Sequence, residues 1–251
     1  FTYDGNVSLT QPTRLTGYVG NWKLATYENE MNNYLYGTDK WTLEEINHLK
    51  TGTGDPDLYP QYNIYDLALK DVSMLTRHNL TARGGSDNIR YFFSGAYLYQ
   101  DSYFKEGVNN FKNYTLRSNV DANITKNLTL TVDLSAQIDR KESGIKDANI
   151  WAEILSSPPY LPYYYSNGLP ASVPAMGAES NIIEEIRGAG GTTDTRNNIL
   201  NSKVEIKWDI SSIIQGLYVS GTGAYDYGNS ASKTFTNSFD YFKYDAVTGT
   251  Y

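Results

Sequence analysis

A two-residue alternation of apolar and polar side chains runs through the stretch from Asn113 to Asp139, NYTLRSNVDANITKNLTLTVDLSAQID. Its second half has apolar side chains at every other position: Leu128, Leu130, Val132, Leu134, Ala136 and Ile138. Polar and charged residues fill the places between them, and the first half follows the same pattern. Successive side chains of a β-strand point to opposite faces, so this period predicts strands with one apolar and one polar face. The stretch is therefore expected to form two such strands joined at Thr125–Asn127.

The same alternation recurs along the chain and predicts about seven strands. They are Phe1–Thr10, Arg77–Gly84, Ile89–Tyr99, Tyr114–Ile124, Leu128–Asp139, Leu200–Asp209 and Leu217–Tyr227. Short connections alternate with long ones between these strands. The short ones are Gly84–Asn88, Thr125–Asn127 and Ile210–Gly216, and the long ones are Thr10–Val72, Gln100–Lys112, Arg140–Asn198 and the tail from Gly228. Short turns on one side and long loops on the other are typical of outer-membrane barrels.

Composition excludes several classes of function. The net charge of −7 argues against a nucleic-acid partner held through its phosphates. The absence of cysteine excludes disulfides, thiol nucleophiles and thiolate metal sites. The mean hydropathy of −0.51 looks soluble, but barrel strands alternate apolar and polar residues and so average to neutral. Because the chain starts at Phe1 rather than Met, we expect a processed product or a fragment.

A soluble antiparallel sheet with one wet face would show a similar alternation. Three observations favour a membrane barrel: most of the strands reach the roughly 9–11 residues that a tilted membrane strand needs, aromatic residues gather near strand ends, and the polar face carries charges. The residues expected to face a water-filled lumen are Arg117, Asn119, Asp121, Asp133, Lys203 and Glu205. The predicted fold class is all-β, a transmembrane antiparallel β-barrel present in part, with short helices in long extracellular loops.

Helical signals lie within the long connections. The segment WTLEEINHLK has Thr42 three residues before Glu45, which is the pattern of a capping box. Apolar residues at helical spacing precede it, from Leu24 to Tyr34. A third helix is predicted over Asp147–Leu155, before the prolines of SSPPYLP.

Several motifs together resemble the SusC/RagA-type TonB-dependent outer-membrane transporters. They are HNLTARGGSDNIRYFFSGAYLYQDSYFK, FKNYTLRSNVDANITKNLTLTVDLS, WTLEEINHLKTGTGDPDLYP, SSPPYLPYYYSNGLP and GLYVSGTGAYDYG. The resemblance spans nearly the whole chain in the right order, and Ile64, where the family tends to have Trp, is one departure. It implies that residues 1–251 are the N-terminal part of a barrel of about 22 strands, with about seven or eight of them present. The plug domain and the remaining strands would lie outside this chain, and Tyr251 would not be the natural C-terminus.

The resemblance also implies a function and partners. The family is expected to import a nutrient, a glycan or a peptide, across the outer membrane of Gram-negative cells, driven by TonB through the absent plug segment. A SusD-like surface lipoprotein would close over the loops. Such a transporter is not an enzyme and needs no cofactor, and the sequence shows no catalytic constellation. His48 and His78 lack metal-ligand spacing, and GDPD at Gly54–Asp57 is expected to be a turn rather than a weak calcium site.

Aromatic residues of the loops are the best candidates for ligand contact. They are Trp22, Trp41, Tyr103, Tyr163, Tyr164 and Tyr165. Tyr and Trp offer flat apolar faces with a polar tip, which suits sugar rings or a peptide. The alternative for each of them is packing within the loops. Two other readings of the whole chain also remain open: a small closed barrel of about eight strands with a structural or adhesive role, and a secreted carbohydrate-binding β-sandwich.

Overall fold

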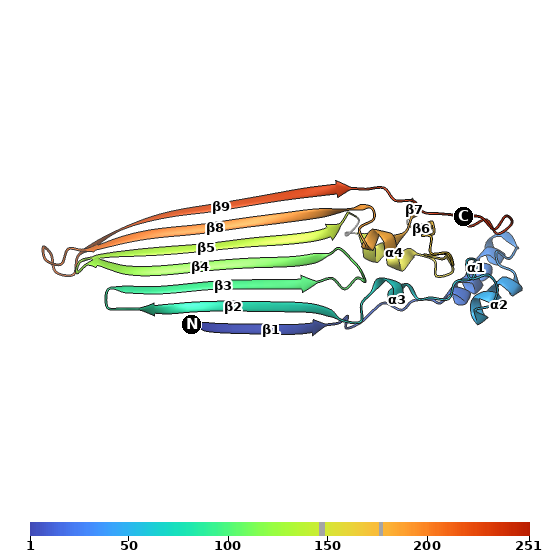
Figure 1. The fold of residues 1–251 in the computed structure, drawn as a ribbon, viewed down its shortest axis with the longest axis horizontal. Helices are drawn as coiled ribbons and strands as arrows, with labels where there is room; N and C mark the ends of the chain where they lie inside the picture. The colour runs from blue at the N-terminus through green and yellow to red at the C-terminus, as the bar shows by residue number, and fades with distance from the viewer. Residues whose placement is uncertain (146–148, 176–177) are drawn as a thin grey trace.

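A seven-stranded antiparallel sheet forms the body of the protein in the computed structural model, which describes residues 1–145, 149–175 and 178–251 (Figure 1). The strand order is β1-β2-β3-β4-β5-β8-β9, so each strand pairs with the next strand of the sheet along the chain. The strands are β1 Thr2–Thr10, β2 Ser73–Gly85, β3 Ile89–Asp101, β4 Asn110–Thr125, β5 Leu128–Gly144, β8 Gly191–Asp209 and β9 Tyr218–Thr236. All seven predicted strands are therefore confirmed.

Several strands are longer than predicted at the end where the long connections begin. β5 continues to Gly144, and β8 begins at Gly191 and has 19 residues, so the predicted loop Arg140–Asn198 is wrong at both ends. The physical reason is that the added segments, such as GTTDTRNN at 191–198, are polar on both faces. Without an apolar face the two-residue period disappears from the sequence, although the backbone pairing continues.

The register gives the sheet one apolar and one polar face. One row across the sheet contains Tyr3, Leu80, Gly95, Leu116, Ala136, Leu200 and Tyr227. The next row, on the opposite face, contains Thr81, Ser94, Arg117, Ser135, Asn201 and Asp226. Large apolar side chains of the first face are exposed to solvent; Leu116, for example, is 62% exposed.

Neither alternative architecture fits the described part of the chain. In a β-sandwich a second sheet would cover the apolar face, but the other sheet among the described residues consists of two three-residue strands, β6 Val173–Ala175 and β7 Ala178–Ser180. In a small closed barrel the first and last strands would pair. Here β1 pairs with β2 and β9 with β8, and within the described residues the sheet stays open.

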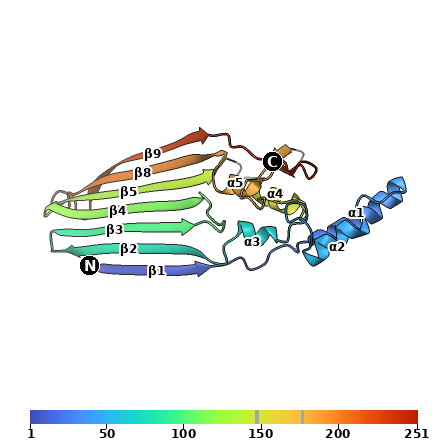
Figure 2. The same ribbon diagram turned by 45° about the vertical axis from the view of Figure 1, so that its right-hand side comes forward.

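The two ends of the sheet differ as the connections predicted. The short turns β2–β3, β4–β5 and β8–β9 lie at one end, on the left of Figure 1. The helices lie at the other end, and we call this part, residues 11–72, 102–109, 149–175, 178–190 and 237–251, the loop cap (Figure 2). Its helices are α1 Asn21–Tyr36, α2 Leu43–Thr51, α3 Ile64–Ala68, α4 Ile150–Ser156 and α5 Ile182–Ile186.

The helix signals of the sequence are confirmed in α1, α2 and α4. Thr42 and Glu45 form the predicted capping box of α2, and the positions Asp147 and Ala148 of the third predicted helix lie outside the described residues. No helix in the described part of the chain has the length and apolar character needed to cross a membrane. The main packed core lies in the loop cap, around Ile64, Ile154 and Ile186, rather than on the sheet.

Candidate ligand site in the loop cap

The tyrosine-rich segment from Tyr160 to Gly168 runs through the core of the loop cap. The Tyr163 side chain is completely buried, and its ring packs 5.5 Å from that of Tyr62. The ring of Tyr18 lies 5.8 Å from that of Tyr65 in the same core. Burial raises the pKa of Tyr18 to about 12 and also raises the pKa of Tyr62 and Tyr163, so all three keep their protons at neutral pH. Tyr163 is thus placed for packing, the alternative that the sequence left open.

Asn181 connects the tyrosine-rich segment to the start of α5. Its side chain is fully buried, and its Nδ2 donates to the carbonyl oxygens of Tyr163 at 2.7 Å and Ala171 at 3.0 Å. Its Oδ1 accepts the backbone N–H groups of Ile183 and Glu184 and so caps α5. A helix start and a loop are therefore tied together by one amide.

Tyr164 and Tyr165 are also engaged within the cap. The Tyr164 hydroxyl contacts Glu184 and Arg187, and the Arg187 guanidinium lies 5.3 Å from the Tyr164 ring. Tyr165 is buried, and its hydroxyl accepts the N–H of Tyr244 at 2.9 Å.

The RGAGG segment at Arg187–Gly191 follows α5 and is held by ion pairs and a backbone hydrogen bond. Arg187 forms ion pairs with Glu106 at 2.9 Å and Glu184 at 3.1 Å. Gly188 has a φ of 84°, which favours glycine, and its carbonyl accepts the N–H of Gly191. The segment is a hydrogen-bonded turn that leads into β8.

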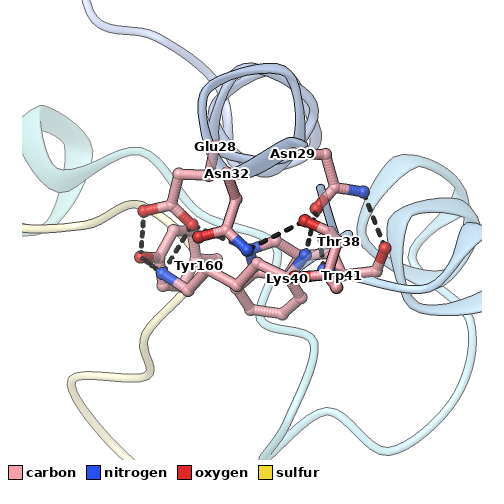
Figure 3. A network of polar contacts seen from close by, with 7 residues as sticks. All are labelled: Glu28, Asn29, Asn32, Thr38, Lys40, Trp41 and Tyr160. Carbon is pink, nitrogen blue, oxygen red and sulfur yellow. Dashed lines mark hydrogen bonds and ion pairs between the residues drawn. The ribbon is translucent and has the colours of Figure 1, made fainter. Parts of the chain in front are cut away.

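A polar network around Glu28 holds the α1–α2 hairpin against the tyrosine-rich segment (Figure 3). Glu28 accepts hydrogen bonds from Lys40 at 2.8 Å, Trp41 Nε1 at 2.7 Å and Tyr160 at 2.7 Å. Burial works against its charged form, but these three donors outweigh burial and hold the pKa of Glu28 below its usual value. Asn29 accepts the N–H groups of Lys40 and Trp41 beside it.

The two tryptophans proposed as ligand contacts belong to this packed region. The Trp41 ring meets the Tyr160 ring edge-on at 4.8 Å. Trp22 is half-buried, with the Nζ of Lys50 5.3 Å from its ring. Both rings are packed against the small core of Ala25 and Leu49.

Tyr103 is the candidate that lines an open groove, which we call the cap groove. This groove of about 500 Å³ lies between the extended segment 11–16 and α4. Its aromatic and apolar lining includes Tyr103, Trp151 and Leu155, and Arg14 is the cation at its edge. Trp151 is 43% exposed. Trp151 lines the groove but is not among the residues that the sequence predicted for ligand contact, because the sequence indicated only that it lies in a helix.

The six residues predicted to face a lumen lie together on the polar face of the sheet, on β4, β5 and β8. Asn119 pairs with Asp133, which pairs with Lys203, in one row. The next row contains Asp121, Thr131 and Glu205. The Lys203 Nζ lies 3.1 Å from Glu205, and Asn119 donates to Asp133. This face is polar and charged, as a water-facing wall requires.

Neither histidine has metal-ligand surroundings. His48 lies on α2 and its Nδ1 is 2.9 Å from the Thr53 hydroxyl, and His78 stacks between Tyr3 and Tyr97 on the apolar face. No cluster of three or more potential ligand residues occurs in the part of the chain that the structure describes.

The predicted turn at GDPD is present, and its carboxylates join distant loops. Asp57 is 4% exposed and accepts from the backbone and hydroxyl of Ser166 and from the Tyr251 hydroxyl. Burial opposes its ionisation, but these donors prevail and lower the pKa of Asp57. Asp55 accepts from Tyr244 at 3.0 Å. The GDPD carboxylates therefore hold the cap together.

Comparison with known proteins supports the fold. The sequence matches no protein-family model and no curated protein. Similar solved structures include the RagAB peptide transporter, with a TM-score of 0.67, and the RagAB peptide importer in the closed-closed state, with a TM-score of 0.66. Each is 16% identical over 92% of this chain, and this chain spans 28% of the length of each.

An identity of 16% shows similarity of fold alone. The described residues thus share the fold of part of those two chains, an antiparallel sheet with loops and short helices at one end. The likeness is consistent with the resemblance to SusC/RagA-type proteins carried by the sequence motifs. These neighbours are transporters rather than enzymes.

Proposed function

We propose that this chain forms part of the barrel wall of a TonB-dependent, SusC-type transporter that imports a peptide or glycan across the outer membrane. One observation carries the proposal: the sheet has an apolar face and a charged face, and neither is covered within the described residues. Lipid on one side and a water-filled lumen on the other account for both faces.

The two ends of the sheet support an orientation for this wall. The short turns would face the periplasm, and the loop cap would face outside, where a SusD-type lipoprotein would close over it. The similarity to the RagAB peptide importer supports such a partner. TonB would act through the plug, and residues 1–251 would be the N-terminal part of the barrel.

The cap groove is the best candidate for ligand contact. Tyr103 and Trp151 present aromatic surface to solvent there, and Arg14 adds a positive charge at the edge. An aromatic wall with one cation suits a peptide or a sugar chain. Substituting both aromatic residues by Ala is expected to weaken uptake without loss of the barrel, because neither side chain is fully buried.

The decisive experiment is topology in intact cells. Cysteines are placed at Ser86, in the β2–β3 turn, and at Tyr34, which is 90% exposed on α1. An impermeant thiol reagent should label the cysteine at position 34 and not that at position 86 in the full transporter. Labelling at position 86 alone would show that the sheet has the opposite orientation. Labelling at neither position or at both would contradict the proposed place of the sheet in an outer-membrane barrel wall.

A companion assay tests transport. Uptake of fluorescent peptide and oligosaccharide mixtures is measured in cells with and without TonB. Uptake of either mixture that disappears without TonB supports the proposal and identifies the cargo class. Uptake that is the same in both strains would contradict it.

A further inference from the structure

A row of basic side chains crosses the apolar face of the sheet just beyond its apolar band. Lys112 of β4 pairs with Arg140 of β5, and Arg140 pairs with Arg196 of β8. The three lie on the same face as Tyr114 and Ile138, because they are two residues away from that row on regular strands. The Lys112 Nζ lies 6.0 Å from the ring of Tyr99, its partner on β3, which confirms this face.

The position of this row matches the outer edge of a membrane. Apolar residues occupy the outward positions of β5 from Leu128 to Ile138. Ten residues along a strand tilted by about 40° cover a depth of roughly 25 Å, which is the height of the apolar band of an outer-membrane barrel. Tyr97 and Tyr114 form an aromatic pair in the last row of this band, at a centroid distance of 5.1 Å. Arg140 comes next, toward the loop cap.

The row is also costly for the sheet itself. Like charges directly opposite each other on neighbouring strands are destabilising, and here three cations stand in register. Carboxylates of the next row toward the loop cap offset these cations in part. Asp194 is shared by Arg140 at 2.8 Å and Arg196 at 3.1 Å. The other two carboxylates bind different partners: Glu142 accepts from Asn110, and Asp101 pairs with Lys70.

Positive charge is left over in this patch. Among the described residues no ion pair involves Lys112, and the opposite neighbour of Asp194 in the register is another cation, Lys233. Both guanidinium groups remain accessible, with the Arg140 side chain 46% and the Arg196 side chain 53% exposed. Asp194 holds both of them in place, so the patch presents oriented donors to an anion.

We propose that Lys112, Arg140 and Arg196 bind the phosphate groups of a phosphorylated outer-leaflet lipid whose acyl chains lie on the apolar band below. This inference rests on the proposed position of the sheet in the outer membrane. One guanidinium group can donate two parallel hydrogen bonds to two oxygens of the same phosphate, which gives geometric selectivity. The aromatic pair supplies the contact at the level of the headgroup, and the leucine-rich rows supply the contact for the chains.

Native mass spectrometry of the full transporter tests the proposal. The protein is purified in detergent and titrated with diphosphorylated lipid A, with the same lipid after removal of its phosphates, and with inorganic phosphate. The Arg140→Gln/Arg196→Gln variant is compared with Arg117→Gln/Lys203→Gln, which removes the same charge from the polar face. Heat-modifiable mobility shows that each variant is folded.

The wild type and the polar-face variant should hold the phosphorylated lipid equally. The Arg140→Gln/Arg196→Gln variant should bind it about thirtyfold more weakly, since each basic side chain near an anionic surface contributes a factor of about five. Equal loss in both variants, or equal binding of the lipid without phosphates, would overturn the proposal. Binding of inorganic phosphate as strong as that of the lipid would assign the patch to free phosphate instead.

The outcome is separable from the proposed function. Cell fractionation and thiol labelling report whether the transporter lies in the outer membrane, whereas the titration reports lipid selectivity of the purified protein. A correctly inserted transporter without selectivity refutes the lipid site alone.

Discussion

Replacing Asn181 by Ala should loosen the loop cap more than any other single helix-cap change. The side chain makes four hydrogen bonds inside a fully buried site, two as donor and two as acceptor. After its removal the Tyr163 carbonyl keeps one partner, the N–H of Ala171 at 3.0 Å. The Ala171 carbonyl and the N–H of Ile183 lose the partner that Asn181 supplied.

The expected cost follows from this count. A buried polar group left without a partner costs about 1–3 kcal/mol, and loss of a helix N-cap typically costs about 1 kcal/mol. The N–H of Ile183 is part of the lost cap, so the stranded Ala171 carbonyl and the lost cap together give about 2–4 kcal/mol. Asn63 offers a matched control, because it caps α3 through one hydrogen bond, from the Tyr65 N–H at 2.9 Å, and is half-buried. Asn63→Ala should cost about 1 kcal/mol.

Hydrogen exchange on the full-length protein in detergent measures both costs as local opening. The amides of Glu185 and Arg187, which close α5, should lose protection by a factor of about 30 to 10³ in Asn181→Ala. Asn181→Asp keeps the acceptor but turns a carboxylate toward two carbonyl oxygens, so it should be no better than Ala. A loss of protection in Asn181→Ala no greater than that caused in α3 by Asn63→Ala would refute the reasoning.

Two further predictions test the sheet and the Glu28 network. Val132→Arg should destabilise the barrel by about 2–4 kcal/mol because Val132 lies in an apolar row, whereas Asp133→Asn should scarcely matter; equal loss of heat-resistant mobility in both would contradict the assignment of faces. The pKa of Glu28 is lowered in the folded protein, so its stabilising effect is present above the usual value of 4.5 and is lost as the pH falls through the lowered one. Protection of α1 should therefore decrease as the pH falls below 4.5, and Glu28→Gln, which cannot ionise, should remove this pH dependence.

The middle of each strand could be predicted from sequence because one face of the sheet is apolar and the other is polar. The strand ends toward the cap could not, since residues such as Thr193, Asp194 and Thr195 alternate between faces without any change in polarity. Their extended conformation depends on pairing with β9, which is far along the chain and carries no signal in the local sequence.

Whether each aromatic residue of the loops is buried or exposed could not be predicted from the sequence either, because it depends on tertiary packing. In α4 the pair Ile150 and Ile154 and the pair Trp151 and Leu155 are each four residues apart. Both stripes are apolar, and the sequence does not say which one faces the core. The structure buries the isoleucines and leaves Trp151 in the groove. The two bonds from Asn181 to the carbonyl groups of Tyr163 and Ala171 likewise depend on tertiary packing.

The open edges of the sheet lead to a last prediction. Within the described residues β1 pairs only with β2 and β9 only with β8, so about half of the backbone groups of each edge strand point away from the sheet. In lipid each unpaired group costs several kcal/mol, and a few of them would exceed the 5–15 kcal/mol of a typical fold. Residues 1–251 expressed alone should therefore aggregate in detergent or lipid, whereas co-expression with the remaining strands of a SusC-type wall should give a monodisperse particle. Measurement of mass and protease resistance after refolding decides between these outcomes. A protease-resistant monomer of the isolated segment would mean that β1 and β9 can pair with each other, and that the wall closes without further strands.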